Sequence, residues 1–261
     1  MTGLVDVARH AAHAAGEILL EGLQKPIEIS YKGVRNLVTN IDRMAEAKIV
    51  ETIRHHFPTH EIEAEEGSQH RTGSPYRWII DPLDGTTNYS HRFPFFCISI
   101  GLIFEGKPHL GVVYDPMRQE FFLAEAGRGA TLNGKALRVS TVAHLSESLL
   151  STGFAYDLET RPENNLNRFV RMSLVAQAIR RTGSAALDLC YVAAGRFDGF
   201  WEQHLHPWDT AAGVLMVAQA GGCVTRFSGG DYSINDPDVL ATNGHIHAQI
   251  VQHLSREDSH A

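Results

Sequence analysis

Apolar positions recur along this chain in two different rhythms. Residues 4–23 and 39–57 place them three or four positions apart, which predicts amphipathic helices. From residue 61 to 126, short apolar runs alternate with turn residues and predict strands at 61–66, 77–81, 95–104, 110–115 and 120–126. Because the connections are too short for crossover helices, we expect these strands to be mostly antiparallel.

The remaining elements follow from the same patterns. Residues 27–30 alternate like a strand, and Asn133-Gly134 predicts a tight hairpin at 132–137. Past residue 145, predicted strands and helices alternate along the chain. We expect strands at 148–154, 197–202, 223–226 and 238–242, and helices at 162–175, 184–196, 208–222 and the C-terminal end. With no repeat or low-complexity linker, 1–261 is expected to be a single domain with halves of about 1–145 and 146–261.

Composition narrows the class of protein. The chain has 261 residues, 43% hydrophobic and 20% charged, which is typical of a globular enzyme and excludes a disordered chain. A net charge of −7 without a long basic run argues against a nucleic-acid partner. Polar breaks in residues 4–23 argue against a membrane span or a signal-peptide core. Three widely spaced cysteines suit buried thiols in a reducing cytoplasm.

Two carboxylates in the stretch WIIDPLDGTTN (78–88) are unusual because they end an apolar run. Pro82 removes a backbone donor and disfavours helix at Asp81, so the strand is predicted to end there. Asp84 then lies on a turn, and Gly85 to Asn88 can open a helix with unsatisfied N–H groups. Carboxylates beside such an anion site make sense if a cation lies between them and a phosphate.

Each acid also has a structural interpretation. Asp-Pro and Asp-Gly favour turns by themselves, and Asp42 could complete a capping box with Thr39. Glu65-Glu66 could be a solvated loop pair, and Asp209 a plain helix N-cap. Four acid clusters, each at the end of an element, nevertheless favour a shared metal site. Oxygen ligands favour Mg²⁺, whereas the 15 histidines show no convincing zinc spacing.

Other chemical motifs are absent from the sequence. The GxG of residues 127–134 leads into a hairpin rather than a helix, so it is not a dinucleotide fingerprint. There is no GxxxxGK[ST] loop and no GxSxG elbow. Metal-assisted phosphate chemistry is what remains.

The chain resembles the inositol monophosphatases of the bacterial type. WIIDPLDGTTNYSHRFPFFCISIGL is similar to the first signature of that family, and HPWDTAAGVLMVAQAGG to the second. AEEG, KGVRNLVTNIDRMAE and GFWE are similar to shorter family motifs. The resemblance implies an α+β fold, a layered αβαβα sandwich with a largely antiparallel N-terminal sheet and a smaller mixed C-terminal sheet.

The resemblance also implies roles for individual residues of a Mg²⁺-dependent, lithium-sensitive phosphomonoesterase. The metal ligands would be the side chains of Glu65, Asp81, Asp84 and Asp209 and the carbonyl of Leu83. Thr86 and Asp42 would orient the attacking water, with Glu65 counted among the catalytic residues. Gly85, Thr86, Ser184, Ala185, Glu202 and Asp209 would contact the substrate. A homodimer is implied as well.

Several substrates and one other class of function stay open. Relatives act on fructose 1,6-bisphosphate, histidinol phosphate or nucleotide bisphosphates, but Glu202 would accept hydrogen bonds from ring hydroxyls and repel a second phosphate. Inositol monophosphate or a similar polyol phosphate is therefore preferred. A regulator that senses a sugar phosphate or binds a protein is the alternative. Gln219 and Gly67 depart from the usual Glu and Ser of the family.

Overall fold

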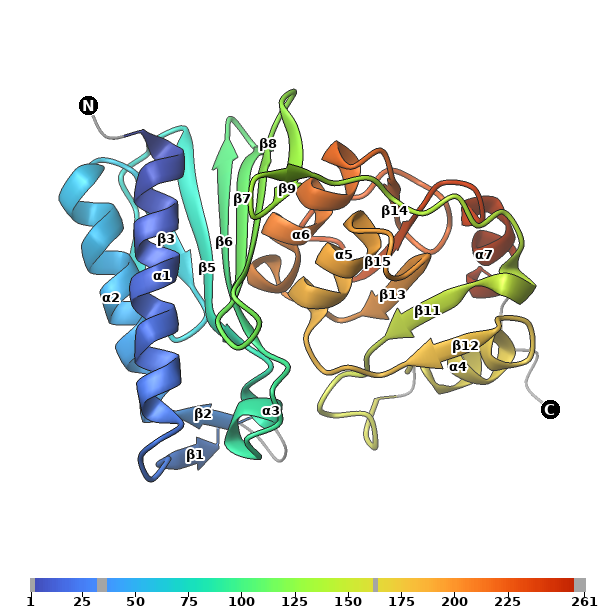
Figure 1. The fold of residues 1–261 in the computed structure, drawn as a ribbon, viewed down its shortest axis with the longest axis horizontal. Coiled ribbons are helices and arrows are strands. Elements are labelled where there is room, and N and C mark those ends of the chain that lie inside the picture. The colour runs from blue at the N-terminus through green and yellow to red at the C-terminus, as the bar shows by residue number, and fades with distance from the viewer. Residues whose placement is uncertain (1–2, 32–36, 162–163, 256–261) are drawn as a thin grey trace.

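The computed structural model describes residues 3–31, 37–161 and 164–255, and these form five alternating layers of helices and sheets (Figure 1). Parts of two predicted stretches, 32–36 of the N-terminal motif and 162–163 of a helix, lie outside the described residues. The helices are α1 (Leu4–Gly22), α2 (Asn40–His56), α3 (Thr86–Ser90), α4 (Leu166–Ser173), α5 (Ala185–Ala193), α6 (Pro207–Gln219) and α7 (His247–Leu254). Helices α1 and α2 cover one face of the larger sheet, and α5 and α6 lie between the two sheets (Figure 1).

The larger sheet has eight strands in the order β10-β9-β8-β7-β6-β5-β3-β4. They are β3 (Glu61–Ala64), β4 (Gln69–His70), β5 (Tyr76–Asp84), β6 (Cys97–Phe104), β7 (Lys107–Asp115), β8 (Glu120–Glu125), β9 (Gly129–Leu132) and β10 (Lys135–Ala136). All pairs are antiparallel except β3 with β5. The hairpin at Asn133-Gly134 is confirmed, and both residues have the positive φ that such a turn needs.

The smaller sheet has five strands in the order β12-β11-β13-β15-β14 and is mixed, as predicted. They are β11 (Leu149–Thr152), β12 (Ala178–Arg180), β13 (Gly199–Gln203), β14 (Cys223–Thr225) and β15 (Asp238–Thr242). Strand β11 runs parallel to β12 and β13, while β15 is antiparallel to β13 and β14. A separate pair, β1 (Ile29–Tyr31) and β2 (Leu37–Thr39), precedes α2, and a short 3₁₀ helix η1 (Leu145–Glu147) precedes β11. The αβαβα architecture is confirmed.

Helix α6 packs unusually close to the larger sheet because two strand positions lack a side chain. A Cβ placed on Gly101 of β6 would lie 2.7 Å from the Cβ of Ala211. A Cβ on Gly111 of β7 would lie 2.7 Å from the carbonyl oxygen of Ala212. Glycines on the sheet and alanines on the helix therefore allow this approach. The packing fixes the start of α6, which carries Asp209, relative to the larger sheet.

The predicted end of the strand at Asp81 is wrong. Strand β5 does not end at Asp81 but continues to Asp84, with a shift of register against β6 between these two residues. Pro82 has no N–H to donate, so the irregularity absorbs it while pairing resumes between Asp84 and Cys97. Both aspartates consequently stay on the sheet, at the C-terminal end of the interior strand β5.

Candidate active site

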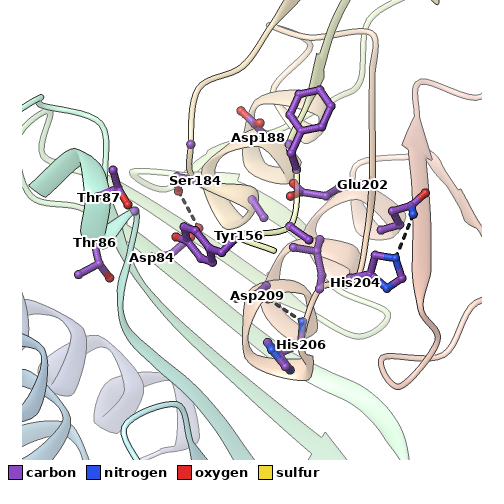
Figure 2. Close-up of a pocket in the computed structure, with 18 of the residues that line it drawn as sticks. Asp84, Thr86, Thr87, Tyr156, Ser184, Asp188, Glu202, His204, His206 and Asp209 are labelled. Atoms are coloured by element: carbon purple, nitrogen blue, oxygen red, sulfur yellow. Dashed lines mark hydrogen bonds between the residues drawn. The ribbon is translucent and has the colours of Figure 1, made fainter. Parts of the chain in front are cut away.

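A cleft of about 690 Å³ lies between the two halves of the chain. It is lined by every residue proposed from the sequence as metal ligand or substrate contact, namely Glu65, Asp81, Leu83, Asp84, Gly85, Thr86, Ser184, Ala185, Glu202 and Asp209. These residues come from β5, α3, α5, β13, α6 and the loop after β3. Figure 2 shows Asp84, Ser184, Glu202 and Asp209 around the same space. The fold therefore brings segments that are far apart in sequence to one place.

The end of β5 is a turn that the carboxylate of Asp81 closes. Its Oδ1 accepts a hydrogen bond from the backbone N–H of Leu83 at 2.9 Å. Gly85 follows with φ of 97°, a left-handed conformation that favours glycine, and α3 begins at the next residue. The structural interpretation of Asp81 is thus correct, but the side chain also lines the cleft.

Asp84 joins the two halves of the chain. Its Oδ2 accepts hydrogen bonds from the hydroxyl of Ser184 and from the N–H of Ala186, both at 2.7 Å. Ser184 is the N-cap of α5, and its hydroxyl also accepts from the N–H of Leu187 at 3.3 Å. The start of α5 is therefore held against the end of β5 by the carboxylate itself.

Thr86 and Asp42 form the pair that the resemblance implies. The Thr86 hydroxyl lies 3.1 Å from Oδ1 of Asp42 and 3.0 Å from the carbonyl oxygen of Leu83, so it can donate to either. Oδ2 of Asp42 accepts from the N–H of Thr39 at 2.9 Å and from the Thr39 hydroxyl, which completes the capping box of α2. Asp42 is fully buried and does not line the cleft, so it reaches the cleft only through Thr86.

Asp209 lies in the first turn of α6, but it is not the N-cap. His206 is the N-cap and Pro207 the first helical residue. Oδ2 of Asp209 accepts from the backbone N–H of His206 at 2.6 Å, the second bond of a capping box. The bond fixes the Asp209 side chain at the edge of the cleft (Figure 2).

Burial and mutual repulsion disfavour the charged form of these acids. Burial raises the pKa of Asp81 well above its usual value, and the charges of Glu65, Asp84 and Asp209 raise it further. Burial also raises the pKa of Asp84 to about 6, although the Ser184 and Ala186 donors act in the opposite sense. A cation among the carboxylates would remove this penalty.

The donor set fits a hard divalent cation, because it consists of carboxylate and carbonyl oxygens. Within the described ranges, no three metal-ligating side chains are already gathered closely enough to enclose an ion. Oxygens of Asp81, Asp84 and Asp209 are instead bonded to backbone or hydroxyl donors. Mg²⁺ usually keeps several of its waters and uses only one or two carboxylates, so it does not need an all-protein cage.

Comparison with known proteins decides the family. The family model described as "Inositol monophosphatase family" matches residues 1–259. The chain belongs to the inositol monophosphatase family. The inositol-1-monophosphatase of Synechocystis sp. is 46% identical over 253 residues, which cover 96% of this chain and 88% of that protein. Nus factor SuhB of Salmonella typhimurium is 42% identical over 264 residues, 100% of this chain and 99% of that protein.

The fold of this family member agrees with solved structures. The inositol monophosphatase of Anabaena (Nostoc) sp. superposes with a TM-score of 0.88 at 46% identity, covering 95% of this chain and 94% of that one. No helix in the part of the chain that the structure describes is long and apolar enough to cross a bilayer.

Sequence reasoning missed residues that support or line this inositol monophosphatase cleft. Glu46, one turn after Asp42 on α2, accepts hydrogen bonds from the N–H of Glu66 at 2.6 Å and of Ser68 at 3.0 Å, and so holds the loop that carries Glu65. The four-residue spacing of Asp42 and Glu46 was the available signal, because it places both acids on one helix face.

Two other missed residues lie in the cleft itself. Asp188 is a buried acid of α5 that accepts a hydrogen bond from the Thr182 hydroxyl at 2.6 Å, and burial raises its pKa well above the usual value. Tyr156 is 48% exposed, yet burial of its hydroxyl end beside Thr87 raises its pKa to about 12. A lone acid in an apolar helix was a signal for Asp188, whereas nothing in the pattern pointed to Tyr156.

The structure accounts for Gln219 and Gly67, the two residues that differ from the family pattern. Oε1 of Gln219 accepts from the N–H groups of Gly127 and Gly129 at 3.0 and 3.2 Å, so it stabilises the turn between β8 and β9. An amide oxygen serves this purpose as a carboxylate would. Gly67 has φ of 105°, a conformation in which serine would be strained.

Proposed function

We propose that this protein is a Mg²⁺-dependent phosphomonoesterase that hydrolyses inositol monophosphate or a similar polyol phosphate. Family membership supports the phosphatase chemistry. The observation that carries the proposal is that buried and half-buried carboxylates from separate segments meet the start of α3 in a single cleft. Such an arrangement suits a phosphate bound through a metal.

The proposed ligands, to be shared by one or more Mg²⁺ ions, are the carboxylates of Glu65, Asp81, Asp84 and Asp209 and the carbonyl of Leu83. When bound, Mg²⁺ would supply a water of lowered pKa and neutralise charge on the phosphate. The raised pKa values of Asp81 and Asp84 support a cation here, since a neighbouring positive charge favours the ionised form.

The protein's own groups have separate tasks in this proposal. The hydroxyl of Thr86, aligned by Asp42, orients the attacking water, and Asp42 takes up its proton through that hydroxyl. Burial raises the pKa of Asp42, which makes the buried carboxylate a better proton acceptor. The N–H groups of Gly85 and Thr86 contact the phosphate oxygens.

The polyol is held at the other end of the cleft. Glu202 and the start of α5 at Ser184 and Ala185 face the ring hydroxyls, which donate to the Glu202 carboxylate. A second phosphate would meet negative charge at Glu202, so fructose 1,6-bisphosphate and nucleotide bisphosphates are poorer substrates. Histidinol phosphate lacks the ring hydroxyls that Glu202 would bind.

A release assay for inorganic phosphate tests the proposal. The panel contains inositol 1-phosphate, glycerol 2-phosphate, fructose 1,6-bisphosphate and histidinol phosphate, each with Mg²⁺ and with excess chelator. We expect Mg²⁺-dependent release that is fastest with inositol 1-phosphate. Phosphate release from none of them would contradict the proposal and favour a regulator, a candidate that the relatives named Nus factor SuhB keep open.

A further inference from the structure

Asn88, in the third position of α3, bonds to both halves of the chain. Its side-chain nitrogen donates to the carbonyl oxygen of Phe95 at 2.7 Å and to that of Thr182 at 2.8 Å. Because both acceptors are carbonyl oxygens, the amide must turn its nitrogen towards them. Both of its N–H groups are thus engaged, one with its own half of the chain and one with a residue 94 positions away.

The segment after Thr182 packs directly on this amide. Gly183 has φ of 88°, and a Cβ on it would lie 3.0 Å from Nδ2 and 3.2 Å from Oδ1 of Asn88. A Cβ on Gly85 would lie 3.3 Å from the carbonyl oxygen of Gly183. The backbones at residues 85 and 183 therefore approach each other beside the Asn88 side chain, with no room for a side chain between them.

This contact lies between the two groups that the proposed reaction must keep in register. One is the start of α3, where Thr86 lies two residues before Asn88. The other is the start of α5, where Ser184 and Ala186 donate to the carboxylate of Asp84. A shift of residues 182–183 would move Ser184 away from Asp84 and from a substrate in the cleft.

We infer that Asn88 is a positioning residue: it holds residues 182–186 against α3, so that the phosphate end and the polyol end of the cleft keep their separation. Its effect on rate rests on the proposed function. Asn88 also lines the cleft, but its two N–H groups are occupied by the carbonyl oxygens of Phe95 and Thr182, so its role is assigned to this bridge and not to a contact with substrate or metal. A misplacement of about 1 Å can cost about 10²-fold in rate, so a fixed bridge beside the contact of Asp84 with Ser184 and Ala186 matters for catalysis.

The matched variants are Asn88→Asp and Asn243→Asp. Asn88→Asp keeps the shape but places carboxylate oxygen against two carbonyl oxygens. Asn243 is a control because its Nδ2 also donates twice across the chain, to Ser140 Oγ at 2.9 Å and to the Val142 carbonyl at 2.8 Å, and it does not line the cleft. Both changes should lower the melting temperature, which makes them comparable as structural lesions.

Kinetics at a temperature where both variants stay folded separate positioning from stability. We expect Asn88→Asp to lower kcat by about 10²-fold and Asn243→Asp to leave kcat within about twofold. Equal losses in the two variants, or an unchanged kcat in Asn88→Asp, would overturn the inference. If Asn88→Asp does not fold, Asn88→Ala removes the donors without adding charge and is expected to lower kcat in the same direction.

A double mutant tests whether Asn88 acts through Ser184. Because both residues serve the same alignment, Asn88→Ala combined with Ser184→Ala should be scarcely slower than the slower single variant. Losses that multiply would show that Asn88 acts elsewhere, and the positioning role would be wrong.

Hydrogen exchange tests the contact without any assay of activity. The N–H of Ala186, bonded to Asp84, should exchange faster in Asn88→Ala than in wild type, and at the wild-type rate in Asn243→Asp. Unchanged exchange at residues 183–186 in Asn88→Ala would overturn the inference. If the wild type releases no phosphate while exchange changes as expected, the proposed function fails and the structural bridge stands.

Discussion

Asp42 uses one carboxylate oxygen for Thr86 and the other for Thr39. Oδ1 lies 3.1 Å from the Thr86 hydroxyl, while Oδ2 accepts from the N–H of Thr39 and completes the capping box of α2. The helix cap and the candidate proton acceptor are therefore one buried side chain. The two interpretations of Asp42 do not exclude each other. The effect of a substitution on kcat must therefore be measured separately from its effect on the free energy of unfolding.

We predict that Thr86→Ala and Asp42→Asn each lower kcat by roughly 10²- to 10⁴-fold, with little change in KM, because positioned acid-base groups contribute about this much. The double variant should be scarcely worse than either single one, since the two residues act as a unit. Steady-state kinetics on inositol 1-phosphate provide the test, and losses that multiply would show that the pair is not a unit.

Thr39→Ala is the control for that experiment. It removes the hydroxyl that accepts from the N–H groups of Ile41 and Asp42 at 3.1 and 3.3 Å and that donates to Oδ2 of Asp42, but it leaves the contact of Thr86 with Oδ1 in place. We expect a loss of about 1 kcal/mol in the free energy of unfolding with kcat nearly unchanged. A large loss of kcat in Thr39→Ala would mean that the cap, rather than the Thr86 contact, governs the rate.

A second prediction concerns the metal. Phosphatase activity should require added Mg²⁺, and excess Ca²⁺ should suppress it, because the larger ion takes looser and higher coordination and positions water less well. The resemblance adds inhibition by Li⁺. Turnover after exhaustive chelation that equals turnover with Mg²⁺ would remove the metal from the proposal.

A third prediction concerns Asp84→Asn, which is nearly isosteric but cannot carry charge. Turnover should fall below detection, while the protein without metal should melt at a higher temperature near pH 7. The reason is that burial raises the pKa of Asp84 to about 6, so ionisation at neutral pH costs the folded state free energy. Scanning calorimetry in chelator measures the second effect. Activity within about tenfold of wild type would leave Asp84 with a structural role alone.

A fourth prediction follows from a histidine outside the cleft. Burial lowers the pKa of His60 below 6.5, and its Nδ1 lies 3.1 Å from the indole N–H of Trp78, which donates to it. The pKa of His60 is lower in the folded than in the unfolded protein. The contribution of neutral His60 to the stability of the fold is therefore fully present above about pH 6.5 and is lost as pH falls through the folded pKa. His60→Gln should therefore flatten part of the acid-side decrease in melting temperature. If the melting temperature of His60→Gln falls on the acid side in the same way as that of wild type, the prediction is wrong.

Local patterns predicted most elements, and long-range pairing explains what they missed. The periods of residues 4–23 and 39–57 depend only on neighbours along the chain, so α1 and α2 were predicted to within about two residues. The end of β5 was not, because pairing of Asp84 with Cys97 on β6 extends the strand beyond Pro82. A proline signal acts locally, whereas a neighbouring strand can override it.

The residues of the cleft also divide into those with a local sequence signal and those that depend on long-range contacts. Acids at element ends were found because each has a signal in its own segment, and the fold then gathers them in the cleft. Glu46 and Asn88 lie within the quoted motifs, but no role was predicted for either, because the backbone groups of Glu66 and Thr182 that they bind lie 20 and 94 residues away and carry no mark of the pairing. Supporting residues of this kind become visible only when the backbone groups they bind are placed in space.

The last prediction concerns Glu202, whose carboxylate lies close to the backbone of Gly153, the residue directly after β11. Burial raises its pKa well above 4.5, and the charge of Asp188 raises it further. The ionised form only accepts hydrogen bonds, whereas protonation turns one of its oxygens into a donor and so weakens the binding of donating ring hydroxyls. The wild-type KM for inositol 1-phosphate should therefore fall as pH rises through this raised pKa. Glu202→Gln should lose this part of the pH dependence and show a KM about tenfold above the wild-type value at high pH, or about 1.4 kcal/mol in binding.

One further variant and two further substrates decide whether this effect belongs to the polyol. A Cβ on Gly153 would lie 2.2 Å from Oε2 of Glu202, so Gly153→Ala should displace the carboxylate and raise the same KM. Glycerol 2-phosphate, which offers fewer hydroxyls, should lose less affinity in both variants, and kcat should change little because Glu202 is assigned to the polyol rather than to the reacting phosphate. Glu202→Gln should also improve the relative rate on fructose 1,6-bisphosphate, since a repelling charge is gone. A KM for inositol 1-phosphate that is unaffected in Glu202→Gln would place the polyol elsewhere in the cleft.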